Sequence, residues 1–148
     1  MRTSVHVEID APAAAVFAYI ADLTNNPTWQ SGVAATNWET GGPGKPGARC
    51  RQTMEDGSDV VYDVVAIEPG RSITMEPEPG STLATTITRT VQVLGDSRCR
   101  VRMHLVGHIQ GWRLLLRPLV IRVVRKSIEA DYRRLKRVLE ADTSPLGN

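Results

Sequence analysis

Residues 5–22, VHVEIDAPAAAVFAYIAD, combine two kinds of hydrophobic spacing within one short stretch. The first part alternates apolar and polar residues, which is typical of a half-buried strand. Asp10 then supplies a candidate N-cap, and Pro12 suits the first turn of a helix, so a helix is predicted over 12–22. A strand that leads directly into a short amphipathic helix is therefore the expected start of the fold. The strand residues predicted to share the buried face are Val5, Val7 and Ile9.

The chain after this stretch predicts turns and strands, and then one long helix. A short helical turn over 27–30 would place Trp29 against the core, and the Gly/Pro-rich segment 41–47 has the composition of a loop. Apolar residues at steps of three, four or seven predict a helix over 112–141. This order favours an α+β fold in which helices cover one face of an antiparallel sheet. The strands predicted between the helices are 33–38, 48–55, 60–67, 72–76, 82–94 and 98–109.

Three segments resemble the polyketide cyclase/dehydrase and lipid-transport superfamily, also called SRPBCC, START-like or helix-grip proteins. They are VEIDAPAAAVFAYIAD at 7–22, NPTW at 26–29 and LKRVLE at 135–140. The resemblance covers almost the whole chain. It implies a curved seven-stranded antiparallel sheet around a long C-terminal helix, with two short helices after the first strand. It also implies a single START-like helix-grip domain over 1–148, with a cavity for an apolar ligand between the sheet and the long helix.

Size, charge and cysteine content narrow the class of protein. The chain has 148 residues, of which 41% are hydrophobic and 23% charged, and these values fit one globular domain. A net charge of +2 does not suggest a nucleic-acid partner. Neither a secretory signal nor a membrane span is visible, so a cytoplasmic protein is expected. No cofactor is expected, and no histidine pair or Cys-x-x-Cys spacing supports a metal site.

Strand parity predicts what the cavity contains. The odd positions of 98–109 are apolar, whereas the even ones include arginines and two histidines, so these histidines are expected on the outer face. Arg89 shares the parity of the apolar residues in 82–94, which would point it into the cavity with Asp131 as a partner that orients a ligand carbonyl or carboxylate. The alternative, favoured because bulges are common in curved sheets, turns Arg89 outward and leaves Asp131 at the helix edge. The candidate ligand-binding residues are Trp29, Met54, Tyr62, Met75, Ile87, Arg89, Val101, Met103, Leu105, Val120, Val124, Ile128 and Asp131.

Three functions are compatible with these features. The first, which we prefer at this point, is binding or transport of a small hydrophobic ligand such as a lipid, isoprenoid or polyketide. The second is a polyketide cyclase/aromatase-type enzyme, for which Arg89, Tyr62 and Asp131 are the polar candidates while the catalytic residues are unknown. The third is an interaction module, because residues 112–141 carry nine basic and three acidic residues. That segment is also the candidate for peripheral membrane contact, and its Leu-rich start for a homodimer contact.

Overall fold

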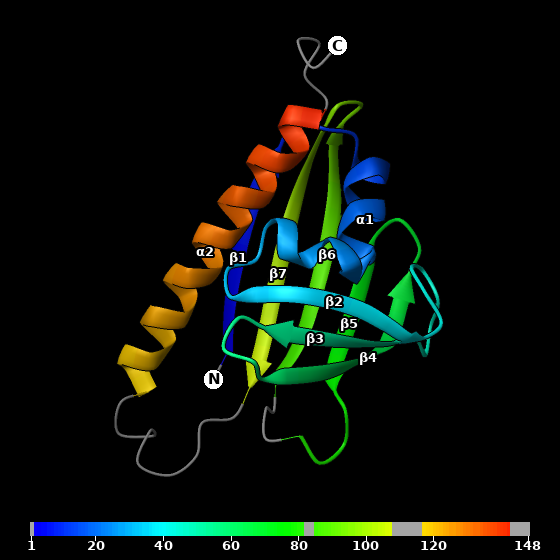
Figure 1. The fold of residues 1–148 in the computed structure, drawn as a ribbon. Helices are drawn as coiled ribbons and strands as arrows, with labels where there is room; N and C mark the ends of the chain where they lie inside the picture. The colour runs from blue at the N-terminus through cyan, green and yellow to red at the C-terminus, as the bar shows by residue number, and fades with distance from the viewer. Residues whose placement is uncertain (1, 82–84, 108–116, 143–148) are drawn as a thin grey trace.

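The computed structural model describes residues 2–81, 85–107 and 117–142. The first strand leads into an α-helix and then a 3-10 helix, six further strands follow, and a long α-helix comes last (Figure 1). The predicted element order is therefore confirmed. Parts of the predicted elements lie outside the described residues, namely 82–84, 108–109 (which include His108) and 112–116. The elements are β1 (Arg2–Ile9), α1 (Ala13–Ala21), η1 (Leu23–Thr28), β2 (Val33–Thr40), β3 (Arg49–Met54), β4 (Asp59–Glu68), β5 (Ser72–Pro77), β6 (Thr85–Gly95), β7 (Arg98–Gly107) and α2 (Arg117–Asp142).

All seven strands form one antiparallel sheet in the order β1-β7-β6-β5-β4-β3-β2. The sheet is strongly curved, so that β2, β3 and β4 run almost across the direction of β1, β7 and β6 (Figure 1). α2 packs beside β1, while α1 contacts β6 and β7. This is the helix-grip α+β architecture, in which one concave sheet holds the long helix.

The core lies between the concave face of the sheet and the helices. β7 alternates as predicted, with its odd positions buried and its arginines and His104 on the outer face. His6 is likewise exposed on β1. In α2 the buried residues are Tyr132, Leu135 and Leu139, whereas Leu119 and Val123 near its start are exposed. The C-terminal half of α2 therefore supplies most of the helix packing.

Two local predictions were wrong. Asp10 is not the N-cap of α1, because Pro12 holds that position in an extended conformation without a side-chain cap. Asp10 instead lies near Arg98, with 3.8 Å between the carboxylate and Nε. The helical turn predicted over 27–30 lies at 23–28, because Asp22 caps it by accepting a hydrogen bond from the Thr24 amide. Trp29 nevertheless packs in the core as expected, with no exposed surface.

The long loop before β3 has the glycine conformations that its sequence requires. Gly41 has a φ of +71°, and a Cβ added there would come within 2.9 Å of the Ala48 side chain. A larger residue at this position would therefore be strained in both its backbone and its contacts. Among the described residues, no helix combines the length and apolar character needed to cross a membrane.

Candidate functional site

A cavity of about 140 Å³ lies between the concave face of the sheet and α2. β6 and β7 form its floor, α2 forms one wall, and the two residues that follow η1 close another side. Most of the lining is apolar, and polar groups are concentrated around one arginine. The lining residues are Trp29, Gln30, Ile87, Arg89, Met103, Leu105, Ile128, Asp131 and Tyr132.

The register of β6 and β7 explains why these side chains share one face. Ile87 pairs with Leu105, and Arg89 pairs with Met103. Directly opposed residues of antiparallel strands point to the same side of the sheet. The only register shift between the two strands comes after Val93, too late to rotate Arg89 outward. The alternative in which a bulge turns Arg89 to the outer face is therefore wrong.

Arg89 is a buried cation, with 2% of its surface exposed. Its Nη1 donates hydrogen bonds to the carbonyl oxygen of Ile20 at 3.2 Å and to Oδ1 of Asn26 at 3.4 Å. Its guanidinium carbon lies 4.9 Å from the centre of the Trp29 ring, within the range of a cation–π contact. Arg89 therefore connects β6 to the end of α1 and to η1.

The predicted pairing of Arg89 with Asp131 does not form. Asp131 accepts a hydrogen bond from Arg134 at 3.2 Å and another from the backbone N–H of Ser31 at 3.1 Å. Arg134 is three residues further along the same helix, a spacing that places the two side chains side by side. Asp131 still lines the cavity, but its charge is already neutralised by a neighbour.

Three polar atoms around Arg89 are buried without a hydrogen-bond partner: Nε1 of Trp29, Nε of Arg89 and the hydroxyl of Tyr132. The rings of Trp29 and Tyr132 meet edge to face, with their centres 5.0 Å apart. Burial raises the pKa of Tyr132, whereas the positive charge of Arg89 and the closeness of its guanidinium to the hydroxyl oxygen oppose that effect. Unsatisfied buried donors are uncommon in native proteins, so a group of three at one cavity is a notable feature.

A second cavity, of about 40 Å³, lies on another side of Arg89 and shares Gln30, Ile87 and Arg89 with the first. Tyr62 lines it, so the side chain of Tyr62 lies on the inner side of β4. Burial raises the pKa of Tyr62, with a smaller opposing effect of Arg89. The remaining lining residues are Leu23, Asn26, Cys50, Gln52 and Met75.

The family model for polyketide cyclase / dehydrase and lipid transport matches residues 1–140. The chain belongs to this family. No curated protein matches the sequence of this family member.

Solved structures share the fold at low sequence identity. The di-domain ARO/CYC BexL of the BE-7585A biosynthetic pathway is 17% identical with a TM-score of 0.80, over 98% of this chain and 48% of that one. This chain thus spans about half of the BexL chain. The Zhui aromatase/cyclase from Streptomyces sp. R1128 is 15% identical with a TM-score of 0.77, over 100% and 98% of the two chains. A START superfamily protein from Mycobacterium smegmatis is 17% identical with a TM-score of 0.72, over 94% and 97%.

Not all of the predicted site residues of this family member lie at the two cavities. Seven of them line the larger cavity and four line the smaller one, with two residues common to both. Val101 is fully buried in the core, and the half-buried Met54, Val120 and Val124 line neither of these two cavities. The seven at the larger cavity are Trp29, Ile87, Arg89, Met103, Leu105, Ile128 and Asp131, and the four at the smaller one are Tyr62, Met75, Ile87 and Arg89.

Sequence reasoning missed four polar residues at these cavities. Tyr132 could have been predicted, because it follows Ile128 by four residues and so lies on the same face of the helix. No sequence pattern indicated the other three, Gln30, Asn26 and Gln52, because their positions depend on how η1 packs against β3. Asn26 Nδ2 donates to Oε1 of Gln52 at 3.1 Å, which fixes the Asn26 oxygen toward Arg89.

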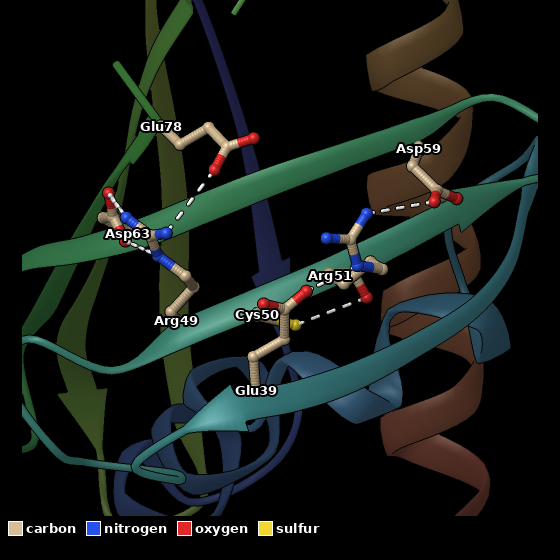
Figure 2. A network of polar contacts seen from close by, with 7 residues as sticks. All are labelled: Glu39, Arg49, Cys50, Arg51, Asp59, Asp63 and Glu78. Atoms are coloured by element: carbon tan, nitrogen blue, oxygen red, sulfur yellow. Dashed lines mark hydrogen bonds and ion pairs between the residues drawn. The ribbon is translucent and has the colours of Figure 1, made fainter. Parts of the chain in front are cut away.

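The outer face of the sheet carries charges of a different kind (Figure 2). Arg49 donates to Asp63 and to Glu78, while Arg51 lies between Glu39 and Asp59. These partly exposed ion pairs compensate one another and contribute little individually. Arg89 differs from them because it is buried and has no acidic partner among the described residues.

The two cysteines are expected to be unreactive in the folded protein. Cys50 and Cys99 have no exposed surface, and burial raises the pKa of the Cys50 thiol to about 11. Only the thiolate is the reactive form. In native protein at pH 8 we therefore expect no labelling by a chromogenic disulfide reagent within minutes, and labelling of both thiols after denaturation in urea. Rapid labelling of Cys50 in the native protein would show that the region around the smaller cavity opens easily.

Proposed function

We propose that the protein binds a small hydrophobic ligand in the cavity between the sheet and α2. The observation that carries this proposal is the cavity of about 140 Å³, whose lining includes the apolar side chains of Ile87, Met103, Leu105 and Ile128. Its volume is close to that of an engineered apolar cavity of about 150 Å³ that takes up benzene. Membership of a family described by cyclase, dehydrase and lipid-transport activities supports a ligand in this position.

A cyclase-type reaction is the second candidate, and inward-facing polar groups favour it. Arg89, Tyr62 and Tyr132 all lie at the cavities. A general acid or base works best when its pKa is near the working pH. Burial instead raises the pKa of both tyrosines, away from neutrality. These tyrosines therefore suit hydrogen bonding to a ligand better than proton transfer, and ligand binding remains the preferred function.

The test combines recovery of the natural ligand with a variant that fills the cavity. Native mass spectrometry of protein purified from its own host, followed by organic extraction, is expected to find one small hydrophobic compound per chain. In Ile128→Trp the larger side chain occupies the cavity, so we expect retention of that compound to fall at least about tenfold. Val123→Trp is the matched control, because Val123 is on the same helix but 61% exposed.

The outcomes separate binding from catalysis and from an occluded cavity. Equal retention by Ile128→Trp and Val123→Trp would place the compound elsewhere and contradict the proposal. Protein free of any compound, whose thermal unfolding also shows no response to added apolar probes, would contradict it as well. Conversion of a polyketone probe by the wild-type protein, lost in Ile128→Trp, would favour the cyclase function instead.

A further inference from the structure

The guanidinium of Arg89 is a buried charge with no counterion among the described residues. Burying an unpaired charge is costly, and arginine stays protonated in proteins. Two neutral oxygens and one aromatic face compensate for part of that cost. Both hydrogen bonds use Nη1, and Nε has no partner. One edge of the guanidinium is therefore held by the protein while the Nε atom remains unsatisfied.

From this arrangement we propose that the ligand is a small carboxylic acid, about the size of one six-membered ring, whose carboxylate binds at Arg89 and whose apolar part fills the cavity. The inference rests on the proposed function and specifies the chemical class of the ligand.

The net positive charge at the cavity favours an anionic ligand group next to Arg89. Among the residues that the structure describes, Asp131 is the only carboxylate that lines the larger cavity, and it is paired with Arg134 at 3.2 Å. The charges of that pair cancel, so the charge of Arg89 is left in excess at the cavity. Arginine is well suited to carboxylates, because its planar fork binds both oxygens.

The unsatisfied donors support the same chemistry. Nε of Arg89, Nε1 of Trp29 and the hydroxyl of Tyr132 are buried around one another without partners. All three groups can donate a hydrogen bond, and the arginine and tryptophan N–H groups cannot accept one. An ionised carboxylate is an acceptor with about four lone-pair sites, so it matches this set, whereas an amide or alcohol of the same shape brings donors of its own.

Size and lining limit the apolar part of the ligand. A volume of about 140 Å³ accommodates one ring or a short branched chain. Trp29, Tyr132 and Met103 are among its lining residues, and contacts of aromatic rings and thioethers with a ring are favourable. A benzoate-sized acid satisfies both limits.

The first experiment needs only the wild-type protein and a matched pair of probes. Benzoate and benzamide have nearly the same shape, but only benzoate carries a charge at neutral pH. Titration followed by NMR at pH 7 is expected to show benzoate binding at least about tenfold more tightly than benzamide. Equal affinity for the two would overturn the carboxylate inference and leave the hydrophobic-ligand function standing. If neither probe shifts a cavity resonance, both the inference and the proposed cavity function fail.

The second experiment uses Tyr132→Phe, which deletes one unsatisfied hydroxyl without changing the ring. That hydroxyl makes no well-formed hydrogen bond in the free protein, although its oxygen lies near the Arg89 guanidinium, so its removal is expected to change the thermal midpoint little. Benzoate affinity should nevertheless fall about three- to tenfold, with benzamide affinity unchanged. Tyr19→Phe is the control, since its hydroxyl bonds Thr28 at 2.5 Å and Tyr19 does not line the cavity. Benzoate affinity that is unchanged in Tyr132→Phe, or reduced equally in Tyr19→Phe, would contradict the inference.

Discussion

Replacement of Trp29 by alanine is expected to lower the free energy of unfolding by about 3–5 kcal/mol. Trp29 has no exposed surface, and its ring contacts Tyr132 of α2 and the guanidinium of Arg89 on β6. The variant therefore loses packing at the point where three parts of the fold meet. Urea unfolding followed by circular dichroism measures the change.

Trp38→Ala provides a comparison for this variant. Trp38 is only half buried, and Nε1 of its ring donates to Asp22 at a long 3.4 Å. We expect Trp38→Ala to cost less than half as much as Trp29→Ala. The backbone carbonyl of Trp29, which accepts from Arg134 at 2.9 Å, is unaffected by either change. A loss below about 1 kcal/mol for Trp29→Ala would mean that the surrounding residues collapse into the vacated space.

Most of the fold prediction rested on the spacing of hydrophobic residues along the chain. The alternation in β1 and β7 fixed which face of each strand is buried, because a shift of one residue would expose the whole apolar set. Local capping was less predictable. Asp10 has the chemistry of an N-cap, yet the N-cap position before Ala13 is occupied by Pro12 in an extended conformation. Such choices depend on energy differences of about 1 kcal/mol, which tertiary contacts easily outweigh.

The candidate site was predicted in part, because parity gives the face of a strand but not the reach of a side chain. Parity correctly allowed Arg89 to point inward. It could not show that Asp131 is engaged by Arg134 and by the Ser31 amide. The absence of a partner for the Tyr132 hydroxyl is also invisible in a sequence, since it depends on how α2 meets β6 and β7.

Arg89→Ala is expected to lower the free energy of unfolding by about 2–4 kcal/mol and to loosen α1 and η1 most. Hydrogen bonds from a charged donor contribute about 1.5–3 kcal/mol each, and the variant leaves the Ile20 carbonyl and the Asn26 side chain without theirs. Relief of the buried charge offsets part of this loss. Urea unfolding measures the total, and amide hydrogen exchange locates it, because protection should fall in α1 and η1 more than in β2 and β3.

Arg89→Lys separates the structural role of this residue from its proposed role toward the ligand. Lysine keeps the positive charge and a donor that can bond the Ile20 carbonyl or Asn26, but it lacks the planar fork. We therefore expect Arg89→Lys to recover more than half of the stability lost in Arg89→Ala while the preference for benzoate over benzamide stays reduced. A lysine variant as unstable as the alanine variant would mean that the geometry of the fork, rather than the charge, holds α1 and η1 to β6. Unchanged hydrogen exchange in α1 and η1 of Arg89→Ala would contradict the structural role, because the bonds to Ile20 and Asn26 are the direct contacts of Arg89 with those helices.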